Sequence, residues 1–165
     1  MGRTSHHGYP ATELMTLVET GTRALLSAVF GPTAEGETSY APRLLHLLRP
    51  DTLVLWDKGF DGNDFLASVT ATRAQFLGRL GSNRRTPVLT RLADGSYLSV
   101  IAAEKVRVID ANTTVTCADG TVFTGSYRRL TSLTDAGRYP AAVLAVSTTS
   151  GGNTNLRITR SATRS

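Results

Sequence analysis

The chain of 165 residues has a length suited to one domain, and its 41% of hydrophobic residues is enough to form a buried core. Its longest apolar stretches, such as Leu53–Trp56 and Ala141–Val146, are far too short to span a membrane, and residues 1–8 lack the apolar segment of a signal peptide. A single cysteine, Cys117, excludes an intrachain disulfide and fits a reducing, cytoplasmic location.

The net charge of +5 is unevenly distributed along the chain. Residues 147–165 contain Arg157, Arg160 and Arg164 and no acidic residue, so they contribute +3 of the +5. The rest of the chain is only mildly basic, and the charge alone is therefore a weak indication of a nucleic-acid partner.

The first part of the chain predicts a β-hairpin and then a helix. Glu13–Glu19 and Arg23–Phe30 are β-type runs joined by a short connection that contains Gly21, a pattern typical of a hairpin. Leucines at positions 44, 45, 47 and 48 have helical spacing and Pro50 follows them, which predicts one amphipathic helix.

The next segment predicts a strand, a helix and a second strand. Asp51–Asp57 is a compact apolar run that ends in an acidic residue, as is typical of a buried central strand. Asp61–Asp64 supplies capping residues for a helix that contains Phe65, and Gln75–Leu80 is compatible with a returning strand. This succession predicts a right-handed crossover and a parallel pair of strands.

After residue 81 the pattern becomes that of an all-β segment. Asp94-Gly95 and Asp119-Gly120 each lie between alternating β-type runs, and each predicts a hairpin turn. Tyr127–Leu133 is predicted to return to the core as a strand. Tyr139-Pro140 then predicts the start of a helix, because proline is favoured in the first helical turn.

The carboxy-terminal segment has a different composition. Leu156 and Ile158 are its only large apolar residues, which predicts a disordered tail. The resulting division is the first part of an α/β core at residues 1–81, an all-β insertion at 82–127, a return to the core at 128–146 and the tail at 147–165.

Asp57 is the acidic residue best placed for chemistry. In open α/β sheets, reactive groups lie at the carboxyl ends of the strands, and Asp57 ends the predicted central strand. The alternative is a structural aspartate that caps a turn, and the residue pattern leaves both roles open.

The segment Leu53–Phe60 resembles the region around the second catalytic aspartate of insertion-sequence DDE transposases, which consists of an apolar strand, Asp, a basic residue, Gly and Phe. Further similarity runs in the family's order over about residues 9–146. It is carried by Val18–Leu26, Ala74–Leu77, Pro87–Leu89, Asp94–Ser99 and Tyr127–Leu133. Each match alone is weak, whereas their succession is fairly specific.

The resemblance implies an RNase H-like mixed-sheet core, incomplete here, whose β insertion lies between the second and third catalytic acids. It also implies DNA binding and metal-dependent cleavage and transfer of DNA strands, with Mg²⁺ or Mn²⁺ held by three carboxylates. Asp57 would be the catalytic and metal-binding residue, and Lys58, Arg84 and Arg85 would contact DNA. A solvated turn is an equally good interpretation of Arg84 and Arg85. The implied partners are transposon ends, a second copy of the chain or a full-length transposase, and no membrane.

The chain also departs from the family pattern. The family's first aspartate would lie upstream of the residues present, and no glutamate follows Glu104, although the third acid should come after Tyr139. A shift of reading frame near Val146 would permit the family's Tyr–Arg–Glu signature in the tail. Trp56 stands where a small residue is usual, so it either crowds Asp57 or belongs to the core. We therefore expect a catalytically incomplete transposase fragment, with a DNA-binding remnant that interferes with a full-length transposase, or a relic without function, as alternatives.

Overall fold

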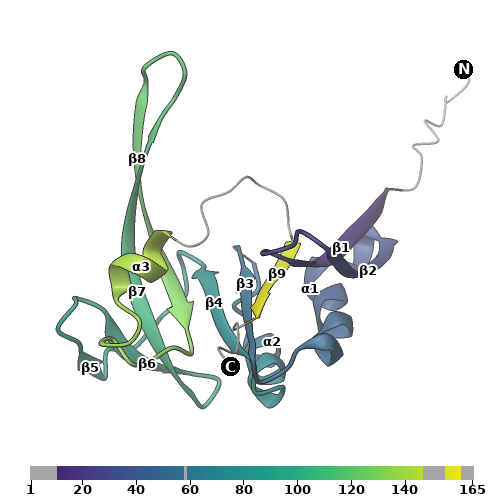
Figure 1. Ribbon diagram of the computed structural model, residues 1–165, viewed down its shortest axis with the longest axis horizontal. Coiled ribbons are helices and arrows are strands. Elements are labelled where there is room, and N and C mark those ends of the chain that lie inside the picture. The colour runs from purple at the N-terminus through teal and green to yellow at the C-terminus, as the bar shows by residue number, and fades with distance from the viewer. Residues whose placement is uncertain (1–10, 58, 147–154, 161–165) are drawn as a thin grey trace, which may run out of the picture.

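A single mixed sheet organises the chain in the computed structural model, which describes residues 11–57, 59–146 and 155–160 (Figure 1). Within these residues the sheet has nine strands in the order β2-β1-β9-β3-β4-β8-β7-β6-β5. The strands are β1 Thr12–Glu19, β2 Leu25–Pro32, β3 Thr52–Trp56, β4 Gln75–Leu80, β5 Thr90–Arg91, β6 Tyr97–Ile101, β7 Glu104–Thr116, β8 Val122–Thr131 and β9 Asn155–Arg160. The predicted α/β class is confirmed, and the architecture is consistent with an incomplete RNase H-like core.

Apolar side chains alternate between the two faces of the central strands, and each face has its own core. Val54 and Trp56 belong to the larger hydrophobic cluster, whereas Leu55 between them belongs to the smaller one. The larger cluster includes residues of the helical segments η2, Ala41–Leu47, and α2, Asn63–Ala71. The smaller cluster includes Leu144 of α3, Ala141–Val146, so helical segments cover both faces.

The predicted amino-terminal hairpin and helix are present, with one difference. β1 and β2 pair in antiparallel fashion, as expected. Leu44, Leu45 and Leu47 lie in the 3-10 helix η2 and Leu48 is its C-cap, so the leucine-rich segment is not the single amphipathic helix predicted. A short 3-10 turn, η1 (Thr33–Glu35), and a one-turn helix, α1 (Glu37–Tyr40), precede η2. Within the described residues, no helix is long and apolar enough to cross a membrane.

The predicted strand–helix–strand unit is confirmed. β3 and β4 are parallel neighbours, and Figure 1 shows their arrowheads pointing to the same end of the sheet. The N-cap of α2 is Gly62, which lies within the predicted capping segment Asp61–Asp64, but no side chain of that segment makes a cap hydrogen bond. The Asp61 carboxylate instead accepts a hydrogen bond from the Gly81 amide at 2.9 Å, and this bond ties the loop after β3 to the end of β4.

Both predicted hairpin turns in the β segment are confirmed. Gly95 and Gly120 have φ angles of 85° and 83°, a conformation that glycine adopts without steric cost. A third turn, between β6 and β7, was not predicted. Its residues Ala102 and Ala103 take the same left-handed conformation, with φ angles of 53° and 65°, although neither is a glycine. β8 crosses residue 127 without interruption and pairs with both β7 and β4, so insertion and core share one sheet.

The structure differs from the sequence prediction in the tail. Residues 155–160 form β9, which lies between β1 and β3 in the interior of the sheet (Figure 1). The sequence Asn155–Arg160 alternates polar and apolar residues, a strand pattern that is masked by the polar composition of the tail as a whole. The remainder of the predicted tail, residues 147–154 and 161–165, lies outside the described residues.

Candidate active site

Asp57 directly follows β3, at the carboxyl end of a central strand, and the predicted position is thereby confirmed. Its side chain is 62% exposed. The neighbouring Lys58, a predicted DNA contact, lies outside the described residues. The catalytic role of Asp57 remains a prediction at this point, because a strand-end position alone does not distinguish a reactive acid from a structural one.

Trp56 belongs to the core. It is 2% exposed, it stacks on Phe76 at 5.3 Å between ring centroids, and it meets Phe65 edge-on at the same distance. Gly78, its partner on β4, makes room for the ring: a Cβ on Gly78 would lie 2.0 Å from the indole Nε1. Since adjacent strand residues face opposite sides of a sheet, the bulk of Trp56 is directed away from Asp57.

Among the described residues, Asp57 forms an ion pair with Arg79 on β4, a residue that no local sequence pattern singles out. The guanidinium Nη1 lies 3.6 Å from the Asp57 carboxylate, and the guanidinium carbon lies 5.5 Å from the centre of the Tyr127 ring. The pairing of Trp56 with Gly78 places the next residues of the two parallel strands beside each other. Once β3 and β4 are recognised as parallel neighbours, this register is the signal that could have identified Arg79.

The carboxyl end of α3 is connected to the same residues. The carbonyl oxygen of Ala145 accepts hydrogen bonds from the Tyr127 hydroxyl at 2.9 Å and from Arg129 at 2.9 and 3.1 Å. Arg129 is 2% exposed and also lies over the Tyr127 ring. A guanidinium at this end of a helix matches the negative end of the helix dipole. Contacts therefore run without a gap from Asp57 through Arg79 and Tyr127 to α3.

A buried ion pair holds the amino-terminal end of α3. The fully buried Arg107 donates to the Asp94 carboxylate, to Ser96 Oγ at 2.8 Å and to the Tyr139 carbonyl at 2.7 Å. Asp94 also accepts the first helical amide, that of Ala141, at 2.9 Å. Burial alone would raise the pKa of Asp94, but the hydrogen bonds from Ser96 and Ala141, together with the charge of Arg107, lower this pKa below its ordinary value. Asp94 thus joins a hairpin turn to the helix.

Arg128 shapes the loop that carries the two predicted DNA contacts. Its guanidinium donates to the carbonyl oxygens of Gly81, Ser82 and Arg84 at 3.3, 3.2 and 2.7 Å. Arg84 is partly buried and donates to the Asn63 side chain, whereas Arg85 is exposed. The loop is therefore fixed from the core side, and at least one of its arginines remains available to a ligand.

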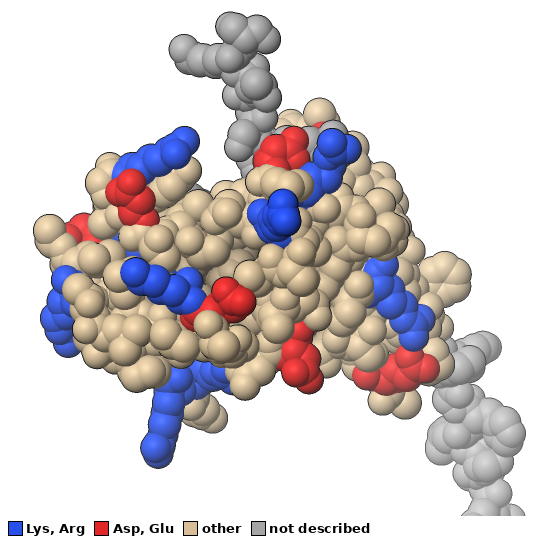
Figure 2. Space-filling view, turned by 90° about the horizontal axis from the view of Figure 1, so that it is seen from below, with Lys and Arg blue, Asp and Glu red and all other residues tan. Residues whose placement is uncertain are grey.

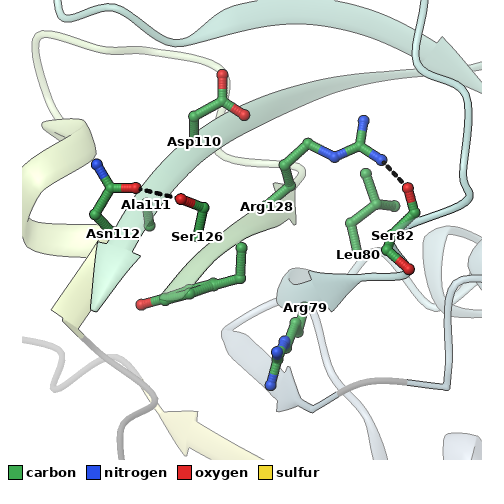
Figure 3. Close-up of a pocket in the computed structure, with 9 residues that line it drawn as sticks. Arg79, Leu80, Ser82, Asp110, Ala111, Asn112, Ser126 and Arg128 are labelled. Carbon is green, nitrogen blue, oxygen red and sulfur yellow. Dashed lines mark hydrogen bonds between the residues drawn. The ribbon is translucent and has the colours of Figure 1, made fainter. Parts of the chain in front are cut away.

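Two shallow cavities lie beside Arg128, one toward Arg79 and one along the loop that carries Arg84 and Arg85. The first, of about 490 Å³, is lined by Arg79, Arg128 and Asp110, among others, and Figure 3 shows the Arg128 side chain extending from β8 to Ser82. The second, of about 660 Å³, extends along the loop past Arg84 and Arg85 and shares Arg128 with the first. On the face seen from below, by contrast, basic and acidic side chains are interspersed (Figure 2).

The remaining acids near the predicted site do not converge on Asp57. Asp61 is engaged with the Gly81 amide, and Asp64 lies in the first turn of α2. Glu19 pairs with Ile158 of β9, which in turn pairs with Val54, so Glu19 lies level with the middle of β3. The described part of the chain contains no group of three or more His, Cys, Asp or Glu side chains able to hold a metal ion. These residues therefore do not fit the two-metal site that the family implies.

Comparison with known proteins identifies the family. The Transposase DDE domain family matches residues 2–146, which is most of the chain. No curated protein and no solved structure matches the sequence. The match includes β3 with Asp57, β4 with Arg79, the hairpins and α3. The chain therefore belongs to the family of transposase DDE domains.

Proposed function

We propose that this chain binds DNA along the arginine-lined surface beside Asp57 and does not by itself cleave or join DNA strands. The surface, hereafter the arginine surface, comprises Arg79, Arg84, Arg85 and Arg128. The family acts on DNA, and guanidinium groups are well suited to phosphate oxygens because they present several donors in a fixed plane.

The contact between Asp57 and Arg79 is the observation that carries this proposal. Two divalent ions would bring four positive charges to the site, whereas Asp57 supplies one negative charge and Arg79, 3.6 Å away, adds a positive one. The family's Mg²⁺ or Mn²⁺ would need further carboxylates, and Asp61 and Asp64 are committed to other positions. A phosphate, in contrast, needs no further carboxylate: it would compete with Asp57 for the Arg79 guanidinium and could also use the neighbouring arginines.

The loop at residues 81–86 favours binding because its backbone is already ordered. Arg128 bonds three of its carbonyl oxygens, and the Thr86 hydroxyl accepts a fourth bond from Arg128 at 3.0 Å. A preorganised loop loses little conformational freedom when it meets a phosphate backbone. Arg85, which is exposed, is therefore the residue whose removal we expect to weaken binding most.

DNA binding is tested by fluorescence anisotropy with a labelled duplex over a range of salt concentrations. We expect the double variant Arg84→Ala/Arg85→Ala to bind more weakly and to reduce the salt slope by about 1 for each phosphate that it no longer neutralises. The matched control is Arg49→Ala/Arg73→Ala, which removes the same charge where the chain enters β3 and β4, at the opposite end of these strands. Equal weakening of DNA binding in the two variants would mean that binding depends only on the net charge of the chain, and it would contradict a defined binding surface.

Catalysis is tested by a nicking assay on supercoiled DNA in Mg²⁺ or Mn²⁺. We expect no metal-dependent nicking above the level of Asp57→Ala, because a set of cooperating catalytic groups loses nearly all its effect when members are absent. Nicking by the native chain that disappears in Asp57→Ala would overturn the proposal and establish the chain as an enzyme.

A further inference from the structure

The β7–β8 hairpin extends beyond the strands on either side of it. β6 pairs with β7 only as far as Val108, and β4 pairs with β8 only from Arg128 onward, whereas β7 and β8 stay paired as far as Thr116 and Val122. Figure 1 shows the result, a two-stranded segment that projects away from the other strands. We call residues 109–127 the ribbon.

One face of the ribbon carries exposed polar side chains that begin next to the arginine surface. Residues paired across an antiparallel ladder share a face, and Asp110 lies opposite Arg128 while Asn112 lies opposite Ser126. Asp110, Asn112 and Ser126 are all exposed. Ile109, on the opposite face, belongs to the hydrophobic cluster that α3 covers, so the polar face is the one that α3 leaves open.

The cavity of about 490 Å³ connects these polar side chains with the arginine surface. Asp110, Asn112 and Ser126 line it together with Arg79. Figure 3 shows the hydrogen bond that Ser126 Oγ donates to Asn112 Oδ1 at 2.9 Å. This bond orients the Asn112 amide, whose nitrogen can donate, and directs the hydroxyl hydrogen of Ser126 away from an incoming donor. The pair is therefore a preoriented hydrogen-bonding site.

The Asp110 carboxylate faces the same cavity as an acceptor. Arg128, directly opposite, donates to the loop at residues 81–86. Within the described part of the chain, Asp110 takes part in no ion pair. The ribbon contains no Lys or Arg, and a carboxylate repels phosphate. A DNA duplex that meets this face would therefore present base edges to it, while its phosphates lie on the arginines.

We propose that Asp110, Asn112 and Ser126 read base edges in the major groove of duplex DNA, and that Asp110 selects cytosine over thymine. The proposal rests on the proposed DNA binding and adds sequence selectivity to it. The major groove is about 12 Å wide and admits a two-stranded β-ribbon.

The selectivity follows from the fact that an ionised carboxylate can only accept hydrogen bonds. Cytosine presents its N4 amino group in the major groove, whereas thymine presents the O4 acceptor there, which a carboxylate repels. Adenine also carries an amino group in this groove, but its N7 acceptor lies beside it and opposes the approach of the Asp110 carboxylate.

Base reading is tested by selection from a pool of duplexes with a randomised centre, using the full chain. Fluorescence anisotropy then compares the selected duplex with versions in which one C·G pair is replaced by T·A. At one position we expect cytosine to be preferred by about five- to tenfold, at the lower end of the usual effect of one mismatched base pair. Asp110→Asn should abolish this preference, because an amide of the same size can also donate to thymine O4.

The matched control is Asp119→Asn, which removes the same charge at the turn of the ribbon, where the carboxylate accepts the Thr121 amide at 2.9 Å. Either substitution should strengthen binding to every sequence, and the ratio of the two affinities should change only in Asp110→Asn. DNA binding without a preference for cytosine, or a preference that persists in Asp110→Asn, would overturn base reading and leave the proposed DNA binding intact. Complete absence of DNA binding would overturn both.

Discussion

Gly78→Ala is expected to destabilise the chain through one contact. A Cβ at position 78 would lie 2.0 Å from Nε1 and 2.1 Å from Cε2 of Trp56, whereas non-bonded atoms normally approach to about 3.5 Å. The indole would have to withdraw by more than an ångström, but Phe65 and Phe76 pack against it with ring centroids 5.3 Å away. Overpacking of this kind costs about 1–3 kcal/mol, and the rigid surroundings favour the upper part of that range.

The measurement is urea denaturation followed by far-ultraviolet circular dichroism, supported by thermal unfolding. A loss of ~2–3 kcal/mol corresponds to a Tm lowered by about 5–10 °C in a domain of this size. Gly125→Ala is the matched control, because it is also a strand glycine but has no atom within 4 Å of the added Cβ, and we expect a change within about 0.5 kcal/mol.

A double-mutant cycle with Trp56→Leu tests the cause. The single substitution Trp56→Leu removes a buried ring and should itself cost about 3–5 kcal/mol. If the clash with the indole is the reason for the effect of Gly78→Ala, the loss of unfolding free energy in the double variant will be smaller than the sum of the two single losses by about 1–2 kcal/mol. Additive losses, or a Gly78→Ala chain as stable as Gly125→Ala, would refute the reasoning.

Three further predictions concern the charged groups. Arg107→Met leaves the Asp94 carboxylate without its buried partner and should cost about 3–5 kcal/mol in urea denaturation. Asp94 has a lowered pKa in the folded chain, so its contribution to stability is complete above its ordinary pKa of 3.8 and is lost as the pH falls through the lower folded value. Acid unfolding below the ordinary pKa of 3.8 should therefore be less steep in Asp94→Asn than in the parent, and identical profiles would contradict this role. Finally, Asp57→Ala frees Arg79 from its carboxylate partner and should strengthen DNA binding at low salt, whereas weaker binding would place Asp57 in a structural role.

Local sequence patterns predicted the part of the fold that positions Asp57. The apolar run Leu53–Trp56, the helix that follows and the strand at Gln75–Leu80 are each specified by neighbouring residues, and the short crossover then leaves parallel pairing as the natural arrangement. The turns at Gly95 and Gly120 were predictable for the same reason, because Asp-Gly pairs fix the backbone conformation locally.

The residues that could not be predicted depend on partners far away in the chain. Arg79 becomes part of the site only through the register of β3 with β4, and Arg107 becomes structural only through Asp94 and Tyr139, which are 13 and 32 residues away. Asp94 is recognisable from its neighbours as a turn residue, although its carboxylate also binds an amide 47 residues later. The Ala102-Ala103 turn lacks the glycine or asparagine that usually indicates such a conformation, and no local pattern could have revealed it.

The place of β9 in the sheet has a consequence for the time course of folding. β9 is the last described element to be synthesised, yet it must insert between strands that begin at residues 12 and 52. Contacts between such distant residues form slowly, because a large loop must close before any pairing compensates for it. On the ribosome, β3, α2 and β4 can assemble from local contacts. The amino-terminal hairpin, in contrast, can join the sheet only after β9 has emerged, when almost the entire chain has been synthesised. Refolding should therefore occur in two kinetic phases, the slower of which joins the two ends of the chain.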